Sequence, residues 1–333
     1  MESWGIYLTF RKRFLTALSM SAAALSAAEF PQAEISNGLI QAKLYLPDAE
    51  KGYYRATRFD WSGQMPSLKY KGHEFFGVWN ERPYDPKLHD AITGPVEEFS
   101  DIEAPGYAEA PVGGIFIKIG VGVLRKPLEK AYDHFKTYEI VDAGKWTVKP
   151  KGDSVEFTQV VNDPQSGYGY EYTKLVRLVK GKPELALEHR LKNTGSKAIA
   201  TEAYDHDFYM LDSQPSGPDF VVKFPFEVKA TGTWTPGLVE LRGKELAYQR
   251  ELQRRESAYN SLTGFGSDVK DYDIRVENVR TGAGVRQTSD RPLSRMVYWS
   301  IRPTVCPEAY VRVEAAPGKE FSWRISYEFY TTR

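Results

Sequence analysis

The chain of 333 residues contains one cysteine, Cys306, and only five histidines. A single thiol excludes an intramolecular disulfide, so the fold must be held by its core, which a chain of this length can form. The patterns H-E-x-x-H, C-x-x-C and G-x-S-x-G do not occur in the sequence. These absences argue against a structural zinc site, a zincin protease and an α/β-hydrolase nucleophile.

An excess of charge of one sign is also missing, because Lys+Arg and Asp+Glu both number 44. Nucleic acids and anionic membranes require a basic surface, so neither is expected as a partner. No internal repeat, low-complexity linker or step in composition marks a domain boundary. We therefore expect one large domain, from residue 29 to residue 333.

The N-terminus has the pattern of a secretion signal. Arg11, Lys12 and Arg13 precede a short apolar stretch, residues 14–24, and small residues follow up to Ala28. The apolar stretch is too short to span a bilayer, and no later segment is longer. The sequence predicts a signal peptide over residues 1–28, cleavage near Ala28, and a periplasmic or extracellular protein; the alternative is a ragged N-terminal helix.

Strand patterns dominate the rest of the chain. Residues 33–46 alternate around a turn at Asn37-Gly38, residues 146–211 read as a β meander, and strands return over residues 271–330. Tyr and Trp, with 21 and 7 residues, suit β-structure and also suit the binding of sugars. The pattern predicts a mainly β protein built from one large antiparallel domain.

Helical periodicity is scarce. Residues 126–136 are expected to form one or two helical turns, and residues 243–260, rich in Glu, Arg and Gln, to form a helix.

Ionisable residues interrupt the apolar pattern in T-E-A-Y-D-H-D-F-Y-M-L, Thr201 to Leu211. His206 lies there between Asp205 and Asp207. Two carboxylates beside an imidazole are expected to raise its pKa toward or above neutrality, which suits a group that donates a proton. The alternative is a structural histidine satisfied by surface carboxylates at a strand end.

Glu308, in V-C-P-E-A-Y, is the second candidate for acid–base chemistry. It follows the aromatic strand M-V-Y-W-S-I-R, where a carboxylate can point into a concave sheet face; the alternative is an exposed loop glutamate. Trp299 is either a platform for a sugar ring or a core residue. Arg58 either clamps ligand hydroxyls or pairs with Asp60.

A metal site is a further alternative, because His89 and Asp90 could join His206 around an ion. Two histidines so far apart in the sequence are a weak signal, so we expect His89 on a loop and neither a metal nor a cofactor. The candidate substrate-binding residues are Arg58, His89, Tyr204, Asp205, Trp299 and Arg302.

Three stretches occur in a characteristic order. The first, E-H-R-L-K-N-T-G-S-K-A-I-A-T-E-A-Y-D-H-D-F, has a strand ending in Asn, a short turn, and a strand with histidine before an aromatic residue. The second, M-V-Y-W-S-I-R-P-T-V-C-P-E-A-Y, ends in C-x-E, and the third, A-P-G-K-E-F-S-W-R-I-S-Y, is a Pro-Gly turn before a last strand. In this order they resemble the galactose mutarotase (aldose 1-epimerase) superfamily.

The resemblance implies a large antiparallel β-supersandwich with few short helices. It also implies that Glu308 is the base that deprotonates the anomeric hydroxyl and that His206 is the acid that protonates the ring oxygen, without a cofactor. Asp205 stands where the family pattern has asparagine. The family's early histidine and arginine have no clean counterpart; His89, Arg58 and Glu97 are the candidates.

Residues 52–63 and 113–136 also depart from ordinary mutarotases, which indicates a divergent branch with its own substrate. We expect a secreted aldose 1-epimerase-like enzyme, a monomer or homodimer, acting on a small-molecule or oligosaccharide sugar. One alternative is a lyase or hydrolase on the same fold, using the same groups with Tyr204 or Tyr209. The other is a non-catalytic carbohydrate-binding protein.

Overall fold

The computed structural model describes residue 1 and residues 30–332. Every strand pairing in this part of the chain is antiparallel. The prediction of a mainly β, antiparallel protein is therefore confirmed. The predicted signal peptide falls almost wholly on residues 2–29, which lie outside the described residues.

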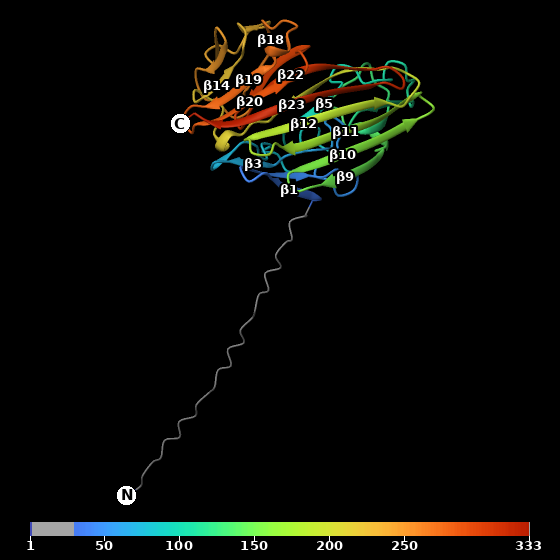
Figure 1. The fold of residues 1–333 in the computed structure, drawn as a ribbon, viewed down its shortest axis with the longest axis horizontal. Coiled ribbons are helices and arrows are strands. Elements are labelled where there is room, and N and C mark those ends of the chain that lie inside the picture. Colours follow the sequence, from blue (N-terminus) through green and yellow to red (C-terminus); the bar gives the residue numbers. More distant parts are fainter. Residues whose placement is uncertain (2–29, 333) are drawn as a thin grey trace.

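A ten-stranded sheet forms the larger layer, and its long central strands run side by side in Figure 1. Along β23, the side chains of Trp323, Ile325, Tyr327 and Phe329 are buried and alternate with more exposed neighbours. This period of two is what places one face of a strand against a core. In spatial order the sheet consists of β16 (Val239–Arg242), β17 (Glu245–Tyr248), β14 (Phe220–Lys223), β19 (Asp273–Asn278), β20 (Ala283–Ser289), β23 (Glu320–Thr331), β12 (Glu184–Asn193), β11 (Tyr168–Leu178), β10 (Ser154–Asp163) and β9 (Lys145–Pro150).

A six-stranded sheet forms the second layer. Its inner face shares one apolar core with the ten-stranded sheet, so its outer face is left for other uses. In spatial order it consists of β15 (Lys229–Ala230), β18 (Ser257–Thr263), β21 (Arg295–Ile301), β22 (Thr304–Ala315), β13 (Ile199–His206) and β5 (Val96–Phe99).

Two smaller sheets complete the fold. The N-terminal one lies next to β9 and β10 in Figure 1, and the backbone N–H of Ser36 bonds the carbonyl of Gly152 across the boundary. As predicted, its first two strands form a hairpin around Asn37 and Gly38, where Gly38 has a φ of 84°. The strands are β1 (Gln32–Ser36), β2 (Ile40–Tyr45), β3 (Ser67–Tyr70) and β4 (His73–Glu74) in one sheet, and β6 (Ile115–Lys118), β7 (Gly122–Arg125) and β8 (Glu139–Asp142) in the other.

Both helix predictions are wrong. Residues 126–136 form a loop, and residues 243–260 contain β17 and the start of β18. The strand β17 lies between β14 and β16, so its backbone groups are paired across the sheet, and this pairing outweighs the helical propensity of its residues. Within the described residues, helical structure is limited to the 3₁₀ turns η1 (Leu211–Ser213) and η2 (Val269–Asp271). No helix there has the length and apolar character that crossing a membrane requires.

Gly94 lies in the loop before β5, and a substitution there tests how closely this loop packs against the end of β13. A Cβ atom at Gly94 would lie 2.2 Å from the carbonyl oxygen of Asp207 and 2.6 Å from that of His206. Gly94→Ala is therefore expected to lower the free energy of unfolding by about 1–3 kcal/mol, because backbone atoms must shift to admit the methyl group. Denaturant titration measures the change.

Gly152→Ala is the matched control, since a Cβ there meets no atom within 4 Å. Equal stability of the two variants would contradict the close packing at Gly94.

Candidate active site

The register of β13 against β22 brings His206 and Glu308, which are far apart in the sequence, together. Tyr204 pairs with Tyr310, and Tyr209 pairs with Val305. The same register places His206 directly opposite Glu308 on the outer face of the six-stranded sheet. Residues opposite each other on one face of an antiparallel pair are in contact distance, and His206 Nε2 lies 3.3 Å from Glu308 Oε1.

Both groups are almost completely buried, at 3% and 6% exposure. Burial raises the pKa of Glu308 to about 8. Burial, together with the charge of Arg58, lowers the pKa of His206 well below its ordinary value. At neutral pH the pair therefore holds one exchangeable proton, which resides on the carboxyl group.

The prediction that neighbouring carboxylates raise the pKa of His206 is wrong. Successive side chains of a strand point to opposite faces, so Asp205 and Asp207 point away from His206 and into the core between the two large sheets. There the hydroxyl of Tyr327 lies within hydrogen-bond distance of both, at 2.9 Å from Asp207 Oδ1. Burial without a nearby unpaired anion then determines the pKa of the imidazole.

Aromatic rings fix the plane of the imidazole. The ring of Phe208 is parallel to that of His206 at a centroid distance of 3.8 Å, and Trp79 stacks on the other side of Phe208 at 4.8 Å. Trp299 meets His206 edge-on at 5.3 Å. His206 Nδ1 has no hydrogen-bond partner among the described residues, so ring packing is what orients the side chain.

A buried ion pair borders the same cavity. Arg58 Nε donates to Glu98 Oε2 at 2.7 Å, and its Nη2 donates to the hydroxyl of Tyr204 at 3.2 Å. His134 Nδ1 lies 2.6 Å from the other oxygen of Glu98. Burial alone would raise the pKa of Glu98, but Arg58, with His134 and Lys118, outweighs it and holds this pKa well below its ordinary value. Glu98 is therefore a fixed anion that orients the guanidinium group of Arg58.

The cavity above the pair has a volume of about 240 Å³. It brings together most of the predicted site residues, namely His206, Glu308, Arg58, His89, Tyr204 and Trp299. Its other lining residues were not predicted as site residues: Trp79, Asp90, Asp101, His134, Phe135, Phe208, Tyr259, Arg295, Val297 and Tyr310.

Some of these residues could have been predicted, because every second residue of a strand lies on the same face as a predicted site residue. Phe208 is two residues after His206, Val297 is two before Trp299, and Tyr310 is two after Glu308. Loop residues such as His134 carry no such signal, and His134 was placed in an expected helix.

The structure does not bring Asp205 or Arg302 to this cavity. Asp205 is fully buried between the sheets, where its paired residue on β5 is Glu97. Glu97 also faces the core, where it contacts Lys174 and His189. Arg302 lies in a neighbouring groove and pairs with Glu251 at 2.9 Å.

A metal site is not evident among residues 30–332, where no three His, Cys, Asp or Glu side chains gather in a way that could hold an ion. His89 Nε2 lies 3.8 Å from Asp90 Oδ2, and both border the cavity. Burial lowers the pKa of His89.

Solved structures define the class of fold. A protein from Synechocystis sp. PCC 6803 aligns over 94% of this chain and 100% of its own length, with a TM-score of 0.57 and 12% identity. A galactose mutarotase related enzyme from Lactobacillus acidophilus covers 90% and 98%, with a TM-score of 0.52 and 12% identity. An aldose epimerase homologue from C. elegans covers 92% and 100%, with a TM-score of 0.53 and 12% identity.

The chain therefore has the galactose mutarotase-like fold, as the sequence resemblance implied. No protein-family model matches the chain, and no curated protein matches it either. At 12% identity these structures show the fold, and the reaction must be argued from the residues of the site.

A substitution of Asp205 tests whether its carboxyl group, buried between the sheets, is protonated in the folded protein. Burial, and then the charge of Glu97, raises its pKa from 3.8 to about 8. The folded protein therefore keeps a proton on Asp205 that the unfolded chain releases, and stability falls as the pH rises between these two values. Asp205→Asn is expected to remove this part of the pH dependence and to raise the free energy of unfolding near pH 8 by about 1 kcal/mol or more.

Denaturant titrations near pH ~5 and pH ~8 measure the effect, because the proton is on Asp205 in the folded state at the lower pH and is being lost at the higher pH. The same pH dependence in the variant and in the wild type would contradict a protonated Asp205.

Proposed function

We propose that this protein is an acid–base catalyst that interconverts the anomers of a sugar. One observation carries the proposal: an imidazole and a carboxyl group lie 3.3 Å apart on one side of an aromatic-walled cavity. The mutarotase-like fold supports it, because enzymes named as mutarotases and epimerases share this fold.

The spacing of the pair suits the anomeric centre. The ring oxygen and the anomeric hydroxyl of a sugar are bonded to the same carbon, so an acid and a base at hydrogen-bond distance from each other can each reach one of them. Glu308 as a carboxylate takes the proton of the anomeric hydroxyl while His206 gives its Nε2 proton to the ring oxygen. The bond between the anomeric carbon and the ring oxygen breaks, and the former hydroxyl becomes the aldehyde oxygen.

Rotation of the aldehyde about its bond to the next carbon presents its other face. The ring hydroxyl then attacks, its proton returns to His206, and Glu308 gives its proton to the aldehyde oxygen. The enzyme ends in its starting state, and no cofactor is consumed.

The reaction requires the proton that Glu308 carries at neutral pH. Before the reaction the proton of Glu308 must pass to His206 Nε2, 3.3 Å away. The transfer turns a neutral pair into an ion pair of unchanged total charge, so its cost in a buried site is small compared with charging either group alone.

Four other predicted residues border the cavity and supply contacts to the substrate. Trp299 offers an aromatic face beside the pair, and Arg58, fixed by Glu98, offers guanidinium donors to ring hydroxyls. Tyr204 and His89 border the same cavity with a hydroxyl and an imidazole. With the predicted signal peptide, these features support a sugar-processing enzyme of the periplasm or the extracellular space.

Substitution of either member of the pair tests the proposal. Glu308→Gln and His206→Asn are each expected to lower the rate of anomer interconversion by about 10²–10⁴-fold, because each removes one of the two proton transfers. The measurement follows anomeric proton signals by NMR after a pure anomer is dissolved, with the uncatalysed rate subtracted.

Glu139→Gln changes an exposed carboxylate on β8 in the same way and serves as the matched control. Wild-type rates in either site variant would refute the assigned role. Cleavage of an oligosaccharide would instead identify a lyase or hydrolase, and binding without turnover a carbohydrate-binding protein.

The pKa of Glu308 also predicts how the catalysed rate depends on pH. The pKa of Glu308 is about 8 in the folded protein, so the pair loses the proton that would pass to His206 as the pH rises through this value. The catalysed rate is therefore expected to fall above about pH 8, since no group then remains to protonate the ring oxygen. A catalysed rate that rises through the same pH would mean that ionised Glu308 acts with an acid other than His206.

A further inference from the structure

A second groove adjoins the cavity of His206 and Glu308. Trp79 lines both spaces, and the outer face of β21 runs from one into the other. Val297 and Trp299 border the cavity, and Ile301, the next residue on that face, borders the groove. Alternate residues of a strand are roughly 6.6–6.8 Å apart, so the groove begins one strand step from the proposed position of the sugar ring.

The groove has a volume of about 420 Å³ and is rich in arginine. Its lining includes Arg82, Arg254, Arg255 and Arg302, against two acidic residues, Glu81 and Glu256. Each of these arginines except Arg255 has an acidic partner among the described residues, so the groove offers one unpaired guanidinium group.

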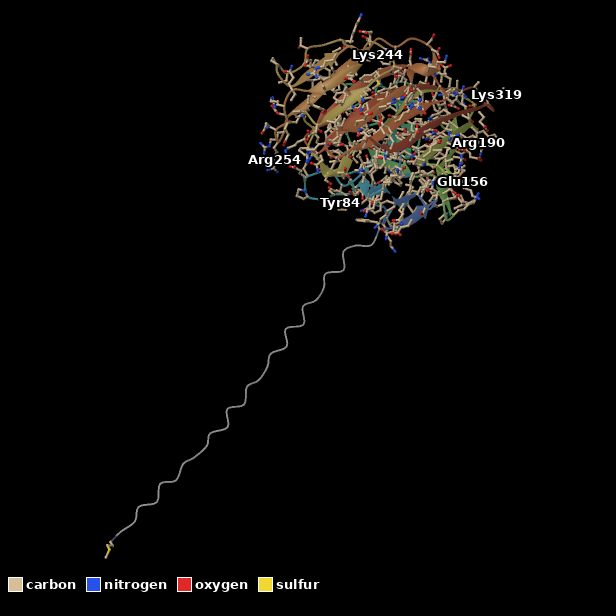
Figure 2. The ribbon with its side chains drawn as sticks, turned by 60° about the vertical axis from the view of Figure 1, so that its left-hand side comes forward. Tyr84, Glu156, Arg190, Lys244, Arg254 and Lys319 are labelled. Carbon is tan, nitrogen blue, oxygen red and sulfur yellow. The ribbon has the colours of Figure 1, made fainter. Side chains whose placement is uncertain are left out.

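Three of these arginines are held by surface ion pairs. Arg254 pairs with Glu81 at 3.1 Å, Arg302 pairs with Glu251, and Arg82 with Asp90. The arginine side chains in these pairs are 47–76% exposed, and Arg254 is seen at the edge of the molecule in Figure 2. Exposed ion pairs contribute little to stability, so an incoming anion can exchange with Glu81 and Glu251 at small cost. Asp90 is buried, so Arg82 stays paired with it and adds its remaining donors.

Arg255 differs from the other three. Its side chain is exposed and makes no hydrogen bond or ion pair with the described residues, and its φ is 71°. A residue other than glycine, asparagine or aspartate rarely adopts a positive φ, and such strain clusters at binding sites. The loop therefore holds an unpaired guanidinium group beside the groove.

We infer that the groove formed by Arg82, Arg254, Arg255 and Arg302 binds an anionic group of the saccharide whose anomeric carbon lies between His206 and Glu308. This inference rests on the proposed function for the position of the sugar ring. Arginine binds carboxylates and phosphates through two parallel N–H donors. The anion is the carboxylate of a uronic acid one ring away or a phosphate on the same ring.

The test compares ligands that differ only in charge. Cellobiouronic acid differs from cellobiose by one carboxylate on the outer ring, and glucose 6-phosphate differs from glucose by one phosphate. Calorimetric titration of the wild type is expected to show about tenfold tighter binding of one charged ligand than of its neutral partner. Which of the two charged ligands is preferred identifies the source of the anion.

Arg255→Asn removes the charge with a residue that tolerates positive φ. It is expected to reduce the preference for the charged ligand over its neutral partner several-fold, and Arg255→Lys is expected to restore part of the preference. Arg312→Asn is the matched control, an exposed arginine on β22 that pairs with Glu314. Thermal unfolding confirms that the variants are folded.

The outcomes separate this inference from the proposed function. Equal affinity for charged and neutral ligands, or a preference that survives in Arg255→Asn and in the double variant Arg254→Gln/Arg255→Asn, overturns the inference even if the wild type interconverts anomers. A preference that depends on Arg255, in a protein without anomer interconversion, supports the groove and refutes the catalytic role of the pair.

Discussion

His206 and Glu308 meet because β13 and β22 pair in one register, and the whole site depends on that pairing. It places an imidazole from the middle of the chain opposite a carboxyl group from its last third. The outer face then receives the acid–base pair, while the same strand sends Asp205 and Asp207 to the inner face. One strand thus serves both the site and the core.

The inner face carries three carboxyl groups whose ionised forms are disfavoured by burial. Asp205, Asp207 and Glu97 lie between the two large sheets, where a lone ionised carboxylate is strongly disfavoured. Lys174 and His189 contact Glu97, whose pKa they hold at about 2 against the effect of burial. The two aspartates have raised pKa values instead, because their burial favours the protonated form. One oxygen of each lies at the hydroxyl of Tyr327, and the other has no hydrogen-bond partner among the described residues.

Much of the fold was predictable because strand alternation and turn residues are local signals. The first hairpin and the long meander followed from them, and the order of three stretches indicated the mutarotase-like fold. The two expected helices failed because β17 and the loop around His134 are determined by tertiary contacts. The pair of His206 and Glu308 was predicted, but its proton distribution was not, because the burial of the pair depends on side chains from distant segments, such as Phe59 and Trp79.

The proposed catalytic pair and the arginines of the groove belong to different kinds of structural element. His206 and Glu308 come from central strands of a sheet, whereas the four arginines come from connecting segments, Arg254 and Arg255 from the loop before β18. Loops tolerate insertion and substitution far better than paired strands do. Ligand preference in proteins of this fold can therefore diverge through changes in loop length while the chemistry of the paired strands is inherited unchanged.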